Sequence, residues 1–544
     1  MTLPGPAEWP VENPLGDPSA DLLRERANVT PDVTAVLDAD AGDTWTYATL
    51  DERVSRRTAR LAARLDAADG RHNPADAQGS LPGGRVGLLA GTRPAFAEVY
   101  FATGRLGASA VPLNVELPVE TLRDQARRAA VDCLVCESAT EPLATDIVPE
   151  SVPVVSVDPP TRDRVASVAL DESMPDSAPA SAERALGADR VVMFTSGTTG
   201  DPKGVRLTRR NLVASAVGSA FRLGVEPDDR WLVCLPMYHM GGLAPLVRST
   251  LYGTTTVIQR SFDAERAAAA LDGYDVTGVS LVPTMLHRLL DAGWHPPGTL
   301  RSVLLGGAPA SDELLTGALD RGIPVYPTYG ATETASQVAT ATPQEARDHP
   351  GTVGRPLRGT DVSILPAGGG DDTDTDATTP VDPGETGEIV VSGPTVTPGY
   401  LDETQTAAAF GPRGFHTGDV GYRDEDGRLW VLGRFDDRIH TGGENVHPAA
   451  VADALTDLPP VAEAVVVGLP DAEWGERVAA LVVAAESGEP PTPGGIRDAL
   501  RGRVSDYARP KTVAVADELP RTASGTVDRE AVRERLADDA TDGD

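Results

Sequence analysis

The 544-residue sequence predicts an α/β protein with three parts: a large N-terminal domain of doubly wound sheets, a β-rich subdomain within it, and a small mobile α+β C-terminal lid domain. Two observations predict this fold. Short apolar runs alternate with helical patterns through most of the chain, and a separate alternating pattern begins after residue 434. With 40% hydrophobic residues, a chain of this length can bury more than one core.

The first alternating stretch begins at Arg85, where short apolar runs and helical patterns follow one another. Its elements are expected at 85–90, 94–107, 108–113, 119–130 and 132–137. This order of strand, helix and strand builds a parallel sheet with helices on its faces. The same rhythm returns in four β-branched runs, so we expect more than one sheet. These runs lie at 229–236, 254–259, 276–283 and 300–307.

Two strand-like runs at 388–393 and 427–434 predict the β-rich subdomain. The segment 366–385 before them is acidic and rich in glycine, and we expect it to be a mobile loop. A compact lid is predicted beyond residue 434 by a helix, two strands, a helix and a strand, at 448–458, 461–470, 477–485, 494–504 and 512–520. We therefore expect an N-terminal domain of residues 1–434 and a lid domain of residues 435–544.

The charge balance is strongly acidic: 81 Asp and Glu against 48 Lys and Arg give a formal net charge of −33. Such a chain is a poor partner for nucleic acid or for an anionic membrane surface. Only Lys203 and Lys511 are lysines. Surplus carboxylates with almost no lysine are typical of a protein from a salt-rich cytosol, so we expect full stability to require salt.

The N-terminal residues contain neither a basic region nor an apolar signal core, and no window is apolar enough to span a membrane. We therefore expect a cytoplasmic protein without membrane insertion. Cys133 and Cys136 form a CxxC pair, but no second pair of cysteines or histidines is available to complete a structural metal site. Buried strand cysteines are the preferred interpretation.

The segment 191–205, VVMFTSGTTGDPKGV, carries the strongest chemical signal. An apolar strand run leads into a loop of hydroxyls and glycines around Lys203, and a helical pattern follows at 207–221. Such a loop offers backbone N–H groups, hydroxyls and one positive charge to phosphate oxygens. It is not a Walker A loop, because Gly204 follows the lysine where a serine or threonine would hold magnesium.

The run TSGTTGDPKGV resembles the signature loop of the adenylate-forming superfamily, which includes the acyl- and aryl-CoA synthetases. Further matches to that superfamily follow in its order and cover nearly the whole chain. They are PMYHMGGL at 236–243, GGAPAS at 306–311, YGATETASQ at 329–337, FHTGDVG at 415–421, GRFDDRIHTGGENVHP at 433–448 and LPRTASG at 519–525.

The resemblance implies a reaction in two halves: a carboxylate joins the α-phosphate of ATP and releases pyrophosphate, and the CoA thiol then displaces AMP. It also implies that Glu333 holds Mg²⁺ and that Thr332 lies near the α-phosphate. Lys203, His239, Thr332 and Glu333 are the implied catalytic residues. The implied ATP-binding residues are Thr195, Ser196, Gly197, Thr198, Thr199 and Gly200 around the phosphates, with Gly307, Ala308, Pro309 and Tyr329 on the adenine and Asp419 and Arg434 at the ribose.

Three further positions concern the lid. The resemblance implies that Asp436 is the hinge between the half-reactions, and that Gly442, Gly443 and Glu444 line the tunnel for the CoA arm. The sequence departs from the family at Thr526, which stands where a lysine reaches the adenylation site. Lys511, Arg521 and Arg529 are candidates to replace that cation.

The acid substrate is a finer inference. PMYHMGGL, TASQ and GGENVHP together look most like the o-succinylbenzoate:CoA ligases of menaquinone biosynthesis. That acid has two carboxylates, so its pocket must neutralise the one that does not react. Arg248, inside an otherwise apolar helix, is the candidate cation, although an amphipathic helix also tolerates a solvated arginine. His239, Ser336 and Gln337 would complete the acid pocket.

Two alternatives stay open. One is another acyl- or aryl-CoA ligase for a fatty, benzoic or cinnamic acid, which would gain nothing from a buried cation at Arg248. The other is a non-catalytic acyl-adenylate binding protein, suggested by Thr526. The expected partners are small molecules, namely a carboxylic acid, ATP and CoA, and the oligomeric state stays open.

Overall fold

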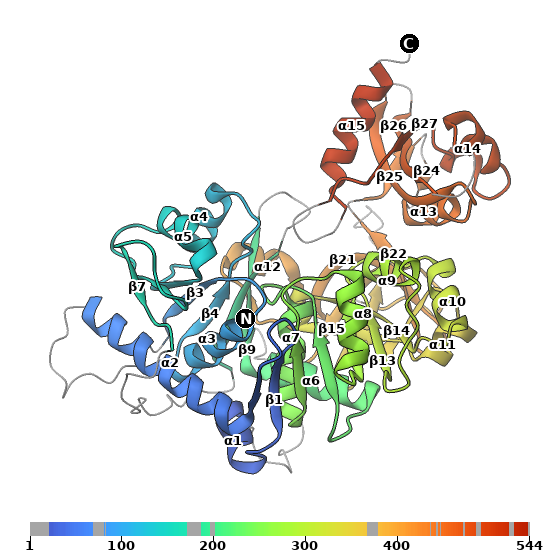
Figure 1. Cartoon of the computed structure of the whole chain (residues 1–544). Coiled ribbons are helices and arrows are strands. Elements are labelled where there is room, and N and C mark those ends of the chain that lie inside the picture. The colour runs from blue at the N-terminus through green and yellow to red at the C-terminus, as the bar shows by residue number, and fades with distance from the viewer. Residues whose placement is uncertain are drawn as a thin grey trace.

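The computed structural model places most of the chain in three β-sheets with helices packed around them (Figure 1). The described residues are 21–68, 81, 83–170, 187–195, 202–366, 379–435, 437–441, 444–446, 448–471, 474–485, 491–521 and 527–541. The third sheet and its helices form a separate lobe, orange and red in Figure 1. Among the described helices, none combines the length and the apolar character that crossing a bilayer requires.

The first sheet has 14 strands among the described residues and joins a parallel half to an antiparallel half. In spatial order they are β17 (Asp361–Leu365), β18 (Gly387–Ser392), β21 (Gly414–Arg423), β22 (Leu429–Arg434), β16 (Thr352–Pro356), β15 (Ser336–Thr340), β14 (Val325–Ala331), β13 (Ser302–Leu305), β12 (Gly278–Leu281), β10 (Arg230–Val233), β11 (Thr255–Ile258), β1 (Thr34–Asp38) and β2 (Thr44–Thr46), with β20 (Phe410–Gly411) on β21. Neighbours from β14 to β1 are parallel, and those from β17 to β14 are antiparallel. The expected β-rich subdomain is thus continuous with the parallel sheet through β15 and β16.

The second sheet follows the alternation predicted for residues 85–137. Its order is β19 (Gly399–Tyr400), β9 (Lys203–Thr208), β8 (Asp189–Thr195), β4 (Ser109–Pro112), β3 (Arg85–Leu89), β5 (Cys133–Cys136), β6 (Val154–Ser156) and β7 (Val165–Ser167). The strands from β8 through β4 to β7 are parallel neighbours, with α3 (Pro94–Arg105) and α4 (Val119–Arg128) as crossovers. Cys133 and Cys136 are buried free thiols of β5, as expected, and burial raises the pKa of each to about 12.

The chain around the signature loop differs from the expected strand, loop and helix. β8 and β9 form an antiparallel hairpin, so that Lys203 begins a strand. The helix α6 (Arg209–Leu223) starts two residues later than predicted. Its start is fixed by Thr208, whose hydroxyl accepts from the Asn211 backbone N–H while the Asn211 side chain accepts from that of Thr208.

The N-terminal elements have no counterpart in the expectations from sequence. They are α1 (Leu22–Val29), β1, β2 and α2 (Tyr47–Ala68). β1 joins the parallel half of the first sheet, where Val36 lies opposite Thr256 of β11. This pairing joins segments from opposite halves of the chain, and local sequence patterns do not predict such contacts.

The third sheet is built entirely from residues after Arg434. It contains β24 (Glu444–Val446), β23 (Ile439–Thr441), β26 (Gly475–Ala484), β25 (Val461–Asp471) and β27 (Thr512–Ala516). Successive residues of β25 and β26 alternate between two cores. Val466 and Val478 pack with α13 (Pro448–Thr456) and α14 (Pro493–Ala499), and Val465 packs with α15 (Arg529–Thr541) on the opposite face.

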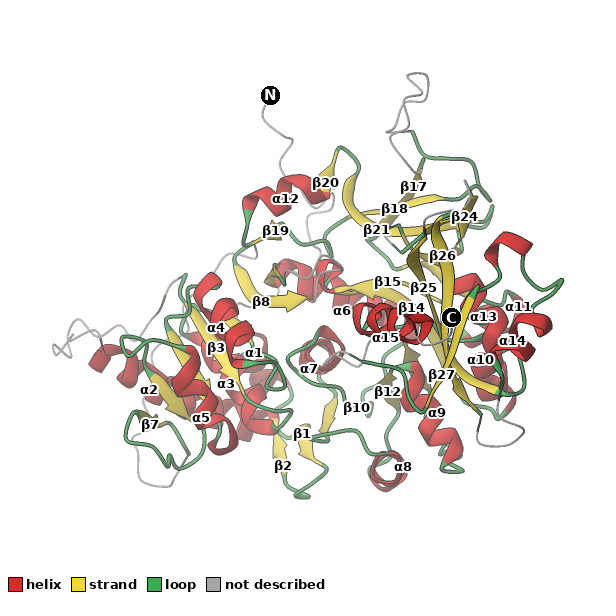
Figure 2. Ribbon diagram, turned by 90° about the horizontal axis from the view of Figure 1, so that it is seen from above, coloured by secondary structure: helices red, strands yellow, loops and turns green. Residues whose placement is uncertain are grey.

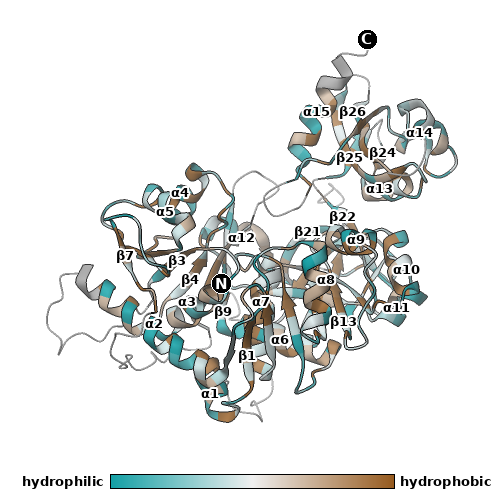
Figure 3. Cartoon of the chain, viewed as in Figure 1, coloured by the Kyte–Doolittle hydropathy of each residue, from teal (hydrophilic) through white to brown (hydrophobic). Residues whose placement is uncertain are grey.

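The helix α7 (Met240–Tyr252) lies between the first two sheets, near the centre of Figure 2. Leu243 and Leu246 belong to one core cluster with Phe96 of α3, Met193 of β8 and Val205 of β9. Figure 3 shows apolar colour along the strands and polar colour on outer helices such as α2. The remaining helices are η1 (Ser138–Thr140), α5 (Glu141–Ile147), α8 (Ala264–Gly273), α9 (Pro283–Asp291), α10 (Asp312–Asp320), η2 (Thr332–Thr334), α11 (Pro343–Asp348), α12 (Glu403–Ala409) and η3 (Asp506–Ala508).

A buried ion triad fastens α2 to α3. The Glu98 side chain is 1% exposed and accepts from Arg53 Nε and Arg57 Nη2, each at 2.5 Å. Burial lowers the pKa of the Arg57 guanidinium, and Glu98 opposes that shift. Glu98 therefore keeps Arg57 charged in the core, where water could not take over the role of the carboxylate.

We predict that Glu98→Gln lowers the free energy of unfolding by about 3–5 kcal/mol, because it leaves two guanidinium groups without their carboxylate. Urea unfolding at constant salt measures this. Glu52→Gln is the matched control, since Glu52 is 68% exposed and pairs weakly with Arg56 at 3.9 Å; its effect should stay within about 0.5 kcal/mol. A loss below about 1 kcal/mol for Glu98→Gln would contradict the triad's role.

Candidate active site

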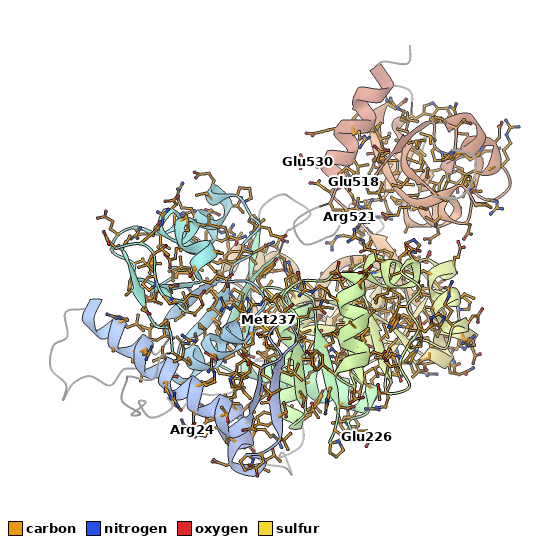
Figure 4. All side chains as sticks on the ribbon, viewed as in Figure 1. Arg24, Glu226, Met237, Glu518, Arg521 and Glu530 are labelled. Atoms are coloured by element: carbon orange, nitrogen blue, oxygen red, sulfur yellow. The ribbon has the colours of Figure 1, made fainter. Side chains whose placement is uncertain are left out.

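Loops that follow the parallel strands of the first sheet gather at one edge. Because β10, β12, β13 and β14 are parallel neighbours, their carboxyl ends lie together. Three of the sequence motifs emerge there: PMYHMGGL after β10, GGAPAS after β13, and YGATETASQ along β14 and β15. Met237, in the loop between β10 and α7, marks this region near the middle of Figure 4 and is fully buried.

Lys203 and Glu333 come together on one tyrosine, Tyr400. The Lys203 Nζ lies 5.5 Å from the centre of the Tyr400 ring, and the Tyr400 hydroxyl donates to Glu333 Oε1 at 2.9 Å. The pairing of β19 with β9 sets this geometry, because Tyr400 lies opposite Val205. The Thr397 backbone N–H also donates to the Glu333 carbonyl at 2.7 Å.

Tyr400 is a site residue that sequence reasoning missed. Burial first, and then the neighbouring Glu333, raise the pKa of its hydroxyl. The tyrosine therefore stays protonated and keeps donating to the carboxylate. Its run GPTVTPGY carries no charged or metal-binding pattern, so nothing in the local sequence marked it.

Asp419, Tyr329 and Arg434 form a second cluster of predicted residues. The Tyr329 hydroxyl donates to Asp419 Oδ2 at 2.5 Å, and Arg434 Nη1 donates to Asp419 Oδ1 at 3.3 Å. Asp419 and Arg434 are register partners on β21 and β22, while Tyr329 comes from β14. Burial raises the pKa of the Asp419 carboxyl, and Arg434 and the Tyr329 hydroxyl lower it. Each carboxylate oxygen still has a lone pair for a ribose hydroxyl.

The predicted adenine wall follows β13. Gly307, Ala308 and Pro309 are exposed, so their surface is accessible to a ligand. Gly307 has φ +82°, a left-handed conformation that favours glycine. Thr332 begins the short helix η2 directly before Glu333. Thr195 ends β8 opposite Lys203.

His239 is the residue before α7 and lies edge-to-face against Tyr238, with ring centres 4.9 Å apart. Burial lowers its pKa to about 4, so the imidazole is neutral at physiological pH. Its Nε2 is buried and has no hydrogen-bond partner among the described residues. An uncharged ring with a free nitrogen suits the wall of a substrate pocket.

Arg248 is buried within α7, with 6% of its surface exposed, so the alternative of a solvated arginine is wrong. Its Nη1 donates to Ser219 Oγ and to Gln337 Oε1, each at 3.1 Å. Both acceptors are neutral, and no carboxylate of the described residues forms an ion pair with it. Burial lowers the pKa of Arg248, but a guanidinium keeps its charge at neutral pH.

Gln337 and Ser336 begin β15. The Gln337 amide is oriented by its Nε2, which donates to Thr340 Oγ1 at 2.8 Å while Oε1 accepts from Arg248. Ser336 has φ +118°, and its carbonyl oxygen would lie 1.7 Å from a Cβ at residue 330. Gly330 is therefore needed for this close approach between β14 and β15. The structure thus joins two of the predicted acid-pocket residues, Arg248 and Gln337.

Several predicted site residues lie outside the described part of the chain. They are Ser196, Gly197, Thr198, Thr199 and Gly200 of the signature loop, the hinge residue Asp436, the tunnel residues Gly442 and Gly443, and Thr526. Residues 367–378 of the acidic segment 366–385 lie outside it too. Glu444, the remaining tunnel residue, is exposed at the start of β24.

The three candidates to replace the family lysine all have contacts within the C-terminal lobe. Lys511 Nζ lies 3.4 Å from the centre of the Trp474 ring. Arg521 pairs with Glu463 at 2.6 Å, and Figure 4 shows it on the side of the lobe that faces the larger sheets. Arg529 pairs with Asp437 at 3.3 Å.

The donor set at Glu333 fits magnesium. Mg²⁺ prefers hard oxygen ligands and is usually held by one or two carboxylates together with substrate phosphates and water. Tyr400 donates to Oε1 of Glu333, and Oε2 accepts no hydrogen bond from the described residues. Lys203, on the same tyrosine, brings a positive charge suited to phosphate oxygens.

Comparison with known sequences gives the family directly. Residues 23–401 match the family AMP-binding enzyme, and residues 450–526 match the AMP-binding enzyme C-terminal domain. A 2-succinylbenzoate–CoA ligase of Bacillus pumilus (strain SAFR-032) is 35% identical over 521 residues, which cover 94% of this chain and 97% of that protein.

Solved structures agree in fold over nearly the whole chain. The o-succinylbenzoate CoA synthetase (MenE) of Bacillus subtilis, in complex with its acyl-adenylate intermediate, is 33% identical with a TM-score of 0.81, covering 94% of this chain and 98% of its own. The same synthetase in complex with ATP and a magnesium ion gives a TM-score of 0.79 at 32% identity, with coverages of 95% and 99%. ATP-bound MatB of Rhodopseudomonas palustris gives 0.81 at 28% identity, with coverages of 96% and 99%.

The family matches and the relatives agree with the predicted fold class, a large mixed-sheet domain followed by a small C-terminal domain. They favour the enzyme over the non-catalytic alternative. The chain therefore belongs to the AMP-binding enzymes of the adenylate-forming superfamily, and it is an AMP-forming acid–CoA ligase that depends on ATP.

Proposed function

We propose that the acid is o-succinylbenzoate, activated as an acyl-adenylate and transferred to the CoA thiol, as in menaquinone biosynthesis. The observation that carries the proposal is the buried guanidinium of Arg248, which has only neutral hydrogen-bond acceptors. A buried cation without a counter-ion favours a ligand that brings a carboxylate. The 2-succinylbenzoate–CoA ligase at 35% identity supports the same acid.

The position of Arg248 along α7 also supports an acid of limited length. Arg248 follows His239 by nine residues, and the eight helical steps from Met240 to Arg248 rise about 12 Å. The guanidinium lies at the level of Trp231, near the start of β10, whereas His239 follows the end of that strand. The distance suits a ring with a short chain between a reacting carboxylate near His239 and a second carboxylate at Arg248.

In the first half-reaction, a carboxylate oxygen of the acid attacks the α-phosphorus of ATP, and the bond to pyrophosphate breaks. Lys203 would hold the phosphate oxygens together with Thr195, Ser196, Thr198 and Thr199 of the signature loop. Tyr400 orients Glu333, which would hold magnesium, and Thr332 would donate near the α-phosphate. Magnesium, when bound, offsets the negative charge of the phosphates.

The nucleoside would lie between the two clusters described above. Gly307, Ala308 and Pro309 would cover one face of adenine and Tyr329 the other. Asp419 would accept from both ribose hydroxyls, because a carboxylate can accept two hydrogen bonds from a vicinal diol. Arg434 supports this role by its hydrogen bond to Asp419 at 3.3 Å.

In the second half-reaction, the thiol sulfur of CoA loses its proton and attacks the acyl carbon, and AMP leaves with the electrons of the broken C–O bond. We propose that the lid, residues 435–544, turns about Asp436 between the two steps. Gly442, Gly443 and Glu444 would then line the path of the thiol arm, where missing side chains give it room.

A second candidate is a different acid. The similarity to MatB leaves the acid open at this identity. The charge of Arg248 favours another dicarboxylate, such as a short aliphatic one, over the uncharged tails of fatty, benzoic or cinnamic acids.

We predict that pyrophosphate release, measured in high salt with ATP, Mg²⁺ and CoA, is fastest with o-succinylbenzoate. The panel should also contain benzoate, a cinnamate, a medium-chain fatty acid and a short aliphatic dicarboxylate. Turnover limited to the aliphatic dicarboxylate would support the role of Arg248 but show that the substrate is a different dicarboxylate. Preference for a monocarboxylate would contradict the proposal.

Arg248→Met should raise the KM for o-succinylbenzoate by about 10- to 100-fold and leave the KM for ATP within about twofold. A hydrogen bond to a charged group contributes about 1.5–3 kcal/mol, and methionine keeps most of the buried volume. The matched control is Arg222→Met on neighbouring α6, where the arginine pairs with Glu345 at 3.4 Å. Equal effects of Arg248→Met on both KM values would show that Arg248 does not contact the acid.

A further inference from the structure

The indole of Trp231 lies against the guanidinium of Arg248. Trp231 belongs to β10, and the Arg248 Cζ lies 4.7 Å from the centre of its ring. A cation within about 6 Å of an aromatic ring is attracted by the negative face of the π system. This contact is more favourable away from water, and Arg248 is buried. Within the described part of the chain, Trp231 is the aromatic ring that lies over this guanidinium.

The position of the indole is itself fixed from the neighbouring strand. Trp231 Nε1 donates to Ser280 Oγ of β12 at 3.3 Å. Its six-membered ring covers Gly278, the register partner of Trp231, so closely that a Cβ there would lie 2.4 Å from Trp231 Cε3. Glycine in a strand marks such a close approach. The sheet thus fixes the orientation of the indole against which the Arg248 guanidinium packs.

Arg248 needs such a support, because its other contacts leave its orientation underdetermined. Both of its hydrogen bonds to the described residues use Nη1, one to Ser219 on α6 and one to Gln337 on β15. A guanidinium has five N–H donors on a long flexible stem. Trp231, Arg248, Ser219 and Tyr252 also line a cavity of about 30 Å³, room for one or two waters, into which an unsupported side chain could turn.

We propose that Trp231 is a positioning residue for acid selectivity. It holds the Arg248 guanidinium in the place where it can bind the second carboxylate of the substrate. The inference rests on the proposed function and deepens it. Trp231 does not act on the reacting carboxylate, because it lies beside Arg248 near the start of β10 and not in the loop that follows that strand. Its effect should therefore fall on the KM of the acid, with kcat and the KM of ATP nearly unchanged.

The test compares Trp231→Leu, Trp231→Phe and Gly278→Ala by steady-state kinetics with o-succinylbenzoate and with the reactive analogue that lacks its second carboxylate. Trp231→Leu should raise the KM for o-succinylbenzoate about tenfold and leave the KM for the analogue within about twofold. Trp231→Phe keeps an aromatic face and should recover most of the loss. Gly278→Ala should behave like Trp231→Leu, because it displaces the indole without altering either partner.

Two control variants separate positioning from packing. Trp294→Leu removes a buried indole from a different core cluster, and Gly87→Ala places a Cβ against Leu134 in the second sheet. Both should lower the melting temperature without changing the preference for the second carboxylate. If Trp231→Leu changes the KM for both acids equally, or behaves like Trp294→Leu, the positioning role is overturned.

The outcomes also distinguish this inference from the proposed function. If the wild-type enzyme shows no preference for o-succinylbenzoate over the analogue, the proposed function fails and the inference fails with it. If the wild type shows that preference, Arg248→Met loses it and Trp231→Leu keeps it, the proposed function stands and only the role of Trp231 is overturned. Loss of the preference in both variants, with recovery in Trp231→Phe, supports both.

Discussion

The buried charge of Arg248 is the constraint on which the account of this enzyme depends. It is only 6% exposed in a helix packed between two sheets, so bulk water does not surround it, and its hydrogen-bond acceptors are a serine and a glutamine. A fold keeps such a charge at a cost in free energy unless a partner arrives. Two other buried or partly buried arginines do have a carboxylate partner: Arg57 pairs with Glu98, and Arg529 pairs with Asp437. For Arg248, by contrast, we propose that the carboxylate comes from the substrate.

The nucleotide half of the site depends on a different constraint, the meeting of two sheets. Lys203 comes from the second sheet and Glu333 from the end of a strand in the first, and Tyr400 contacts both. Tyr400 reaches this position because the short strand β19 adds to the edge of β9. One aromatic side chain therefore contacts both the cation that we propose for the phosphates and the carboxylate that we propose for the metal. Neither sheet alone contains the site.

Much of this could be predicted from the sequence, because the signals were local. The helix and strand patterns beyond residue 434 and the alternation at 85–137 predicted elements that the structure contains. Ordered motifs identified the family and brought Asp419, Tyr329 and Arg434 into one proposed site. What could not be predicted depends on contacts between distant segments. Tyr400 carries no motif, Trp231 reads as an ordinary strand residue, and the pairing of β1 with β11 joins opposite halves of the chain.

The most direct test of the central claim is the binding of two stable acyl-adenylate mimics, identical except that one carries the second carboxylate and the other an uncharged group of similar size. Isothermal titration calorimetry in high salt gives both Kd values without any turnover. The account predicts that the carboxylate mimic binds the wild-type enzyme at least about tenfold more tightly, since a charge-assisted hydrogen bond to a buried guanidinium contributes about 1.5–3 kcal/mol. Equal Kd values would show that the charge of Arg248 does not meet the substrate, and would contradict the account.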